Sequence, residues 1–137
     1  RDLHLSLRRQ RQTCIRDSEY SDIGKSSLAF FKYVNDQGGI HGRNIELIII
    51  DDQLKPDITL KNFIPFSFKN DIFSIFSSIG NKTNQAVYPF LKKHRIRSFF
   101  IGSDLPEWNL PVRKSVFTFL PTADTESRVL AIVFGIV

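Results

Sequence analysis

The chain has 137 residues, of which 42% are hydrophobic and 24% are charged, and its formal net charge is +5. This length suits one domain with a hydrophobic core, and the composition is that of an ordinary globular protein, so we expect no intrinsic disorder. No apolar stretch reaches the roughly 18 residues that a membrane-spanning helix needs, and the single cysteine, Cys14, cannot form a disulfide within the chain.

The start of the chain carries a weak strand signal and a cluster of arginines. Residues 3–7 alternate apolar and polar side chains, which predicts a short strand, and the basic stretch RRQRQ follows directly. We expect this stretch to be a solvated surface. No helix-turn-helix, zinc-finger or aromatic-interleaved basic strand accompanies it, so we expect no nucleic-acid partner.

A helix and a strand are predicted next. Apolar residues at helical spacing predict a helix over residues 23–37, and Gly38 and Gly39 supply the left-handed stop that commonly ends a helix. The run IELIII at residues 45–50 predicts a strand that is buried on both faces.

The rest of the chain continues this alternation of helix and strand. Pro56 is expected to open a helix at its first position, and Pro65 is expected to end it. Further strands are predicted at residues 71–80, 96–102 and 115–119, and further helices from about residue 83 and over residues 122–134. This order predicts an α/β fold with an open parallel sheet and helices on both faces.

Two short motifs invite a nucleotide-binding interpretation. The stretch IGKS (23–26) matches the second half of a phosphate-binding loop, and LIIIDD (47–52) looks like a strand that ends in magnesium-binding acids. The loop needs a glycine where Glu19 stands. The glycines at 38–42 precede a strand, so carbonyls are free there, and N–H groups are not. We expect the two aspartates to end the strand and to hydrogen-bond the turn before the next helix.

No set of catalytic or metal-binding residues stands out. The histidines His4, His41 and His94 are far apart in the sequence and have no cysteine or aspartate partner at metal-ligand spacing. The Gly-x-Ser-x-Gly motif of many hydrolases is missing as well. We therefore expect neither an enzyme nor a cofactor.

A candidate ligand-binding loop follows the strand predicted at residues 71–80. Ligands of open parallel sheets gather at the carboxyl ends of the strands, and this end carries the small polar residues of SSIGNKTN. Gly80 and Asn81 can bring backbone and amide groups close to a ligand. Thr83 lies where the next helix presents unpaired N–H groups, which favour a carboxylate.

A second candidate loop follows the strand predicted at residues 96–102. It offers the flexible Gly102, the hydroxyl of Ser103 and the carboxylate of Asp104, which could pair with an ammonium group. A carboxylate site beside an ammonium site describes an amino acid or a related compound. The alternative is that both loops are only polar turns and helix caps.

Three segments resemble a known family in order and spacing: residues 28–56, which include GGIHGR and the two aspartates, residues 72–104 and residues 109–127. They resemble the N-terminal part of bacterial ABC-transporter substrate-binding proteins of the branched-chain amino-acid (Leu/Ile/Val) type. The resemblance implies the type I periplasmic-binding fold and a non-catalytic receptor that closes two lobes on a small solute.

The same resemblance implies a periplasmic or extracytoplasmic location, membrane permease subunits as partners, and an amino acid or similar ligand. In that family the carboxylate end of the ligand is held by two loops. The matching residues here are Gly80, Asn81, Thr83, Gly102, Ser103 and Asp104, the same residues that the strand-end argument selects.

On this resemblance, residues 1–137 are expected to be a single partial domain, the N-terminal ligand-binding lobe. Residues 1–19 diverge from the family pattern, and residues 120–137 are expected to begin the crossover toward a second lobe. Two alternatives stay open. The chain could be an extracytoplasmic sensor domain of a signalling protein, or a degenerate remnant without binding activity, which Pro65 and the divergent start favour.

Overall fold

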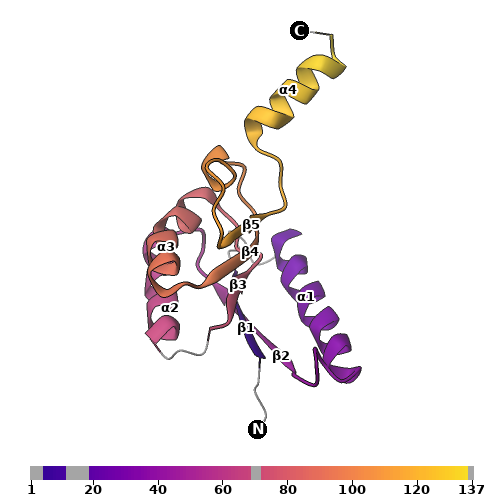
Figure 1. Cartoon of the computed structure of the whole chain (residues 1–137), viewed down its shortest axis with the longest axis vertical. Helices are drawn as coiled ribbons and strands as arrows, with labels where there is room; N and C mark the ends of the chain where they lie inside the picture. The colour runs from indigo at the N-terminus through magenta and orange to yellow at the C-terminus, as the bar shows by residue number, and fades with distance from the viewer. Residues whose placement is uncertain (1–4, 12–18, 69–71, 136–137) are drawn as a thin grey trace.

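The computed structural model of the chain describes residues 5–11, 19–68 and 72–135, so the predicted strand residues 3 and 4, His4 and Cys14 lie outside the described residues. Strands and helices alternate along the chain (Figure 1). Their bounds are β1 (Leu5–Arg11), α1 (Glu19–Asp36), β2 (Ile45–Asp51), α2 (Pro56–Phe68), β3 (Ser74–Phe76), α3 (Asn81–His94), β4 (Arg97–Ile101), the 3₁₀ helix η1 (Pro106–Trp108), β5 (Val116–Thr118) and α4 (Ala123–Val133).

The strands pair in parallel in two groups. One group is β1 with β2, and the other has the order β3-β4-β5. The two groups lie side by side through β1 and β3. Figure 1 shows α1 on one side of the strands and α2 and α3 on the other. The predicted α/β class, with parallel strands and helices on both faces, is confirmed.

The first strand differs from its prediction because it includes the arginine-rich stretch. Residues 5–11 all pair in register with β2, from Leu5 beside Ile45 to Arg11 beside Asp51. Strand formation depends strongly on the neighbouring strand. The regular, β-branched β2 supplies that neighbour, and pairing with β2 extends β1 to Arg11.

The end of α1 is built as the sequence predicts. Gly38 and Gly39 adopt φ values of 96° and 69°, and the N–H of Gly39 donates to the carbonyl of Val34 at 3.0 Å. The side chain of Asn35 then brackets the backbone of Ile45, with hydrogen bonds of 2.7 and 2.8 Å. These contacts hold the end of α1 against the first residue of β2.

Helix α2 begins at Pro56 as predicted, but it continues through Pro65 to Phe68. The prediction that Pro65 ends the helix is therefore wrong. A proline removes one N–H and crowds the carbonyl four residues earlier, here that of Lys61. Both Pro65 and Lys61 are exposed, so water can reach this carbonyl, and little helix remains beyond the interruption.

Two clusters of buried side chains form the core. The larger cluster joins α2, α3 and the neighbouring strands through Phe63, Ile75, Val87, Leu91 and Ile96. The smaller cluster consists of Ile101, Trp108 and Val116, with Tyr88 and Leu105 packed against it. Strand β2 is less covered than predicted. Its residues 47–50 are only half-buried, because β2 lies at the end of its strand group.

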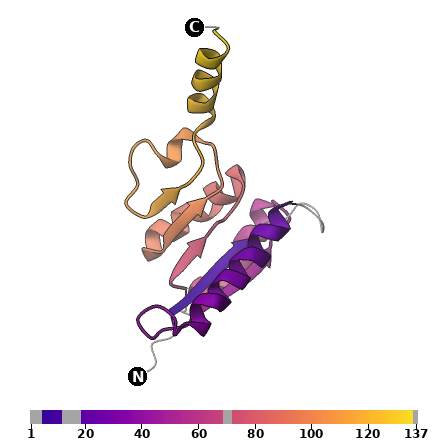
Figure 2. The ribbon, with the colours of Figure 1, turned by 90° about the vertical axis from the view of Figure 1, so that its right-hand side faces the viewer.

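Helix α4 stands away from the rest of the described chain (Figures 1 and 2). None of its side chains is buried. At its base, the backbone N–H of Ala123 donates to the carbonyl of Asp104 at 3.1 Å. Its exposed apolar residues are Val129, Leu130, Ile132 and Val133, followed by Phe134. Within the described ranges, no helix combines the length and the apolar character that a membrane span requires.

Candidate ligand site

The two predicted ligand loops lie side by side at the carboxyl ends of β3 and β4. Beyond the regular strands, Ile79 and Gly102 pair in parallel. The N–H of Gly80 donates to the carbonyl of Gly102 at 3.0 Å, and the N–H of Gly102 donates to the carbonyl of Ser78 at 2.8 Å. These bonds join the two loops into one unit.

The first turn of α3 presents unpaired backbone donors to this place. Its N-cap residue, Gly80, has φ 111° and ψ 142° and provides no side-chain cap. The first backbone hydrogen bond of the helix is made by Asn84, whose N–H donates to the carbonyl of Gly80 at 3.3 Å. In the part of the chain that the structure describes, the amides of Asn81, Lys82 and Thr83 have no hydrogen-bond acceptor. Together with the helix dipole, they favour an anion.

The predicted polar side chains form a connected chain of hydrogen bonds. The indole N–H of Trp108 donates to Ser103 Oγ at 2.8 Å, and Ser103 Oγ donates to Asn81 Oδ1 at 2.8 Å. Asn81 Nδ2 then donates to Asp104 Oδ1 at 2.9 Å. Asp104 is half-buried, so its carboxylate remains reachable from solvent.

The side chain of Thr83 is buried and bonded to the first loop. Its side chain is 1% exposed, and its hydroxyl donates to the carbonyl of Ile79 at 3.2 Å. Beside it, Asn84 accepts a bond of 2.7 Å from the Ser78 hydroxyl and donates one of 2.6 Å to the carbonyl of Gly80. Thr83 therefore offers a ligand its backbone N–H, while its side chain holds the loop.

These groups line a hollow of about 520 Å³, a volume that suits a small solute. All six residues that the sequence selects, three from each loop, lie on its surface. The complete lining is Leu54, Ile79, Gly80, Asn81, Lys82, Thr83, Gly102, Ser103, Asp104 and Leu120. The hollow thus combines unpaired N–H groups, one carboxylate and two leucine side chains from other loops.

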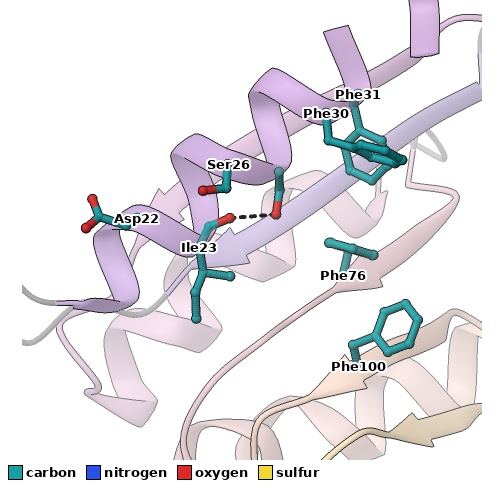
Figure 3. Close-up of a pocket in the computed structure, with 8 residues that line it drawn as sticks. Asp22, Ile23, Ser26, Phe30, Phe31, Phe76 and Phe100 are labelled. Atoms are coloured by element: carbon teal, nitrogen blue, oxygen red, sulfur yellow. Dashed lines mark hydrogen bonds between the residues drawn. The ribbon is translucent and has the colours of Figure 1, made fainter. Parts of the chain in front are cut away.

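A second hollow, of about 710 Å³, lies between α1 and the strands β3 and β4 (Figure 3). We call it the aromatic groove; its apolar lining is Ile23, Phe30, Phe31, Phe76 and Phe100. The rings are in edge contact, with centroids 5.3 Å apart for Phe31 and Phe76 and 5.5 Å apart for Phe76 and Phe100.

Two of the polar side chains on the rim of the aromatic groove, those of Asp22 and Ser27, have partners on α1. Asp22 forms an ion pair with Lys25 at 3.2 Å, and the hydroxyl of Ser27 donates to the carbonyl of Ile23 at 2.6 Å (Figure 3). The groove also lies on a face of the sheet and not at the strand ends. We therefore place the candidate site for a polar ligand in the smaller hollow.

The two aspartates at the end of β2 act as the sequence predicts. Asp51 Oδ1 accepts from the N–H of Gln53 at 2.9 Å, and Asp52 Oδ1 accepts from the N–H of Leu54 at 3.1 Å. Asp52 Oδ2 accepts from the hydroxyl of Thr59 at 2.6 Å. Both carboxylates thus fix the turn into α2. Across residues 5–11, 19–68 and 72–135, no three His, Cys, Asp or Glu side chains gather as metal ligands.

A family model described as "Periplasmic binding protein" matches residues 16–134. The chain belongs to the periplasmic binding protein family. The family expected from the sequence resemblance is confirmed. The name of the family describes proteins that bind in the periplasm. A search of curated protein sequences finds no match.

Solved structures of periplasmic binding proteins share the fold of the chain. A possible leucine/isoleucine/valine-binding protein from Rhodopirellula baltica SH 1 has a TM-score of 0.73 and 16% identity, over 95% of this chain and 36% of its own. An ABC transporter substrate-binding protein from Desulfitobacterium hafniense, in complex with Leu, has a TM-score of 0.71 and 18% identity, over 94% and 38%. A fatty acid ABC transporter substrate-binding protein from Thermomonospora curvata has a TM-score of 0.76 and 17% identity, over 98% and 34%. The chain spans little more than a third of these proteins.

The site of this periplasmic binding protein chain also includes residues that were not selected from the sequence. Ile79 and Lys82 belong to the first predicted loop and line the hollow. Leu54 follows β2 and Leu120 follows β5, and both line the hollow. The strand-end rule would have found them if it had been applied to every strand. Trp108 gave no local signal, because its contact with Ser103 depends on the path of the chain through η1.

Proposed function

We propose that this chain is the ligand-binding module of a non-catalytic solute receptor and that it binds the zwitterionic end of an amino acid. One observation carries the proposal. The unpaired amides of the first turn of α3 and the carboxylate of Asp104 line the same hollow. The amides favour a carboxylate, and Asp104 favours an ammonium group.

In this proposal the amides of Asn81, Lys82 and Thr83 receive the ligand carboxylate. The Lys82 side chain, on the rim of the hollow, adds a positive charge. Gly80 and Gly102 allow the backbone to approach the ligand. The loops are already close, because a Cβ atom on Gly102 would lie 3.0 Å from Ile79 Cγ1.

Asp104 supplies the opposite charge. Its Oδ1 atom accepts from Asn81, and its Oδ2 atom makes no hydrogen bond to another described residue. Oδ2 is therefore available to a ligand ammonium group, which forms charge-assisted hydrogen bonds with carboxylates. Leu54 and Leu120 line the same hollow and suit an aliphatic ligand side chain.

The charge at Asp104 favours an amino acid over a fatty acid. Solved structures with this fold include one in complex with Leu and one named for fatty acid transport. Both ligand types carry a carboxylate, but only the amino acid carries an ammonium group. A carboxylate side chain in the hollow attracts the first ligand and repels the second.

For the complete receptor we propose delivery of the solute to ABC permease subunits in the membrane, from the periplasmic or extracytoplasmic side. Membership of the periplasmic binding protein family supports this role. We also propose that residues 1–137 form one lobe and that residues 120–137 begin a crossover to a second lobe. The support is that α4 leaves the body and buries none of its side chains.

Nuclear magnetic resonance titration of the chain tests the binding proposal. We expect L-leucine to shift the amide resonances of residues 81–83 and the resonances of Asp104. 4-Methylpentanoate, which lacks the ammonium group, should shift only residues 81–83. One lobe covers the ligand from one side, so the binding should be weak.

The variant Asp104→Asn serves as the matched control for charge, because it keeps an oxygen that can accept from Asn81. It should weaken leucine binding and leave 4-methylpentanoate binding unchanged or stronger. The proposal is wrong if neither compound shifts these resonances at tens of millimolar, or if the shifts cluster elsewhere in the chain.

A further inference from the structure

The hydroxyl of Ser103 is fully occupied by the protein itself. Its oxygen accepts from the indole N–H of Trp108 at 2.8 Å and from the backbone N–H of Leu105 at 3.4 Å. Its one proton goes to Asn81 Oδ1 at 2.8 Å. A serine hydroxyl has one donor and two acceptor positions, so Ser103 has no hydrogen-bonding capacity left for a ligand.

The direction of this hydrogen-bond chain follows from the two N–H groups that meet Ser103. An indole N–H and a backbone N–H can only donate. Trp108 and Leu105 therefore fill both acceptor positions of the Ser103 oxygen, and the Ser103 proton is donated to Asn81. The carbonyl oxygen of the Asn81 amide therefore faces Ser103, and its NH₂ group faces Asp104, where it donates at 2.9 Å. This orientation presents a donor to the Asp104 carboxylate, as an ionised acid requires.

The packing around Trp108 holds its indole in place, so Trp108 can fix one end of the row of hydrogen bonds. It is 2% exposed and packs with Ile101 and Val116. The Tyr88 ring meets it edge-on, with centroids 5.3 Å apart. The Arg113 guanidinium lies 4.3 Å from the Tyr88 ring centroid and 5.0 Å from that of Trp108. The indole is thus held from several sides by α3, β4, β5 and the segment after η1.

We propose that Trp108 is a positioning residue for the ligand site. Through Ser103 and Asn81, its indole N–H holds the carboxylate of Asp104 in the orientation that meets a ligand ammonium group. Ser103 is then an internal relay and not a ligand contact. The inference rests on the proposed function, in which Asp104 binds the ammonium end of an amino acid.

The variant Trp108→Phe keeps an aromatic ring but removes the donor. The variant Ser103→Ala breaks the same chain one link later and leaves Trp108 in place, so it keeps the test valid if Trp108→Phe folds poorly. Tyr88→Phe is the matched control. It alters an aromatic residue of the same cluster whose hydroxyl makes no hydrogen bond to another described residue.

The first measurement needs no ligand. In both test variants we expect the side-chain NH₂ resonances of Asn81 to move and the chemical shifts of its two protons to become more alike. Ser103→Ala removes the partner of the Asn81 amide, and Trp108→Phe removes the donor that fixes this partner. Tyr88→Phe should leave these resonances in place. Unchanged Asn81 resonances in folded Trp108→Phe and Ser103→Ala would overturn the inference.

The second measurement compares L-leucine with 4-methylpentanoate. Both test variants should weaken leucine binding by about three- to tenfold, the range for one lost hydrogen bond. 4-Methylpentanoate should bind as before, because its carboxylate meets the α3 amides. Equal weakening for both compounds would show a merely structural role and would overturn the inference. If the unchanged protein binds neither compound, the proposed function fails, and the Asn81 resonances alone decide whether Trp108 orients the site.

Discussion

The hydroxyl of Thr59 donates to Asp52 Oδ2 at 2.6 Å, and both side chains are completely buried. The bond joins the end of β2 to the first turn of α2. We predict that Thr59→Val, which keeps the shape but removes the donor, lowers the free energy of unfolding by about 1–3 kcal/mol. Urea denaturation measures this loss. Asp51→Asn, at an exposed site in the same turn, is the control and should change stability by less than about 0.5 kcal/mol. Equal losses in both variants would contradict the importance of the buried bond.

A second prediction concerns the proline inside α2. Pro65→Ala restores a backbone N–H that can bond to the carbonyl of Lys61, and it should stabilise the protein by about 1–3 kcal/mol. Pro56 begins the same helix, where a missing N–H is harmless. Pro56→Ala should therefore have little effect on the denaturation midpoint. A destabilised Pro65→Ala variant would show that the proline ring contributes packing that outweighs the restored bond.

The sequence predicts the parts of this fold that depend on neighbours along the chain. Gly38 and Gly39 predict the end of α1, and the two aspartates after the isoleucine run predict the turn into α2, because these bonds span only a few residues. The extension of β1 to Arg11 could not be predicted in this way. It depends on pairing with β2, a segment more than thirty residues away along the chain.

The candidate site also has parts that the sequence predicts and parts that depend on contacts between distant segments. The sequence selects Gly80, Asn81 and Asp104 as candidates because the carboxyl ends of parallel strands meet at one edge of a sheet. The roles of Ser103 and Trp108 required the three-dimensional structure. Their hydrogen bond depends on how η1 and Arg113 place the indole, and no spacing in the sequence reports that packing.

A third prediction concerns the backbone conformation of Gly80. Its φ of 111° and ψ of 142° lie in a backbone region that essentially only glycine adopts. Gly80→Ala should lower the free energy of unfolding by about 1–3 kcal/mol and displace the unpaired amides of α3. Gly102→Ala is the comparison, because a Cβ atom there would press only on Ile79 Cγ1 at 3.0 Å. Thermal denaturation should rank Gly80→Ala as the more harmful change, and the reverse ranking would contradict the backbone argument.

A fourth prediction is that the aromatic groove binds a dye with an apolar ring system. Phe30 lines the groove and is 61% exposed, whereas Tyr33, on the same helix, is 62% exposed but is not part of its lining. Phe30→Ser combined with Phe100→Ser should reduce the fluorescence of anilinonaphthalene sulfonate severalfold. Tyr33→Ser should not change it. An equal reduction in both proteins would locate the dye outside the groove.

Helix α4 should be the least protected helix of the described chain in amide hydrogen exchange. It buries no side chain, whereas α3 buries four, namely Thr83, Asn84, Val87 and Leu91. Helices with few buried contacts open locally at low free energy. We expect the α4 amides to exchange at least about a hundredfold faster than those in the middle of α3. Comparable protection would show that α4 packs against another surface in solution.

The backbone hydrogen bond from Ala123 to Asp104 ties the first residue of α4 to the candidate site, while the rest of the helix extends away from it. Its base is hydrogen-bonded to the backbone of a residue at the candidate site, and its 11 residues extend over about 16 Å. A tilt of about 10° at the base therefore moves the far end of the helix by about 3 Å. Any backbone change at Asp104 that tilted this hydrogen-bonded base would therefore move the far end of α4 more than the residues at the hollow.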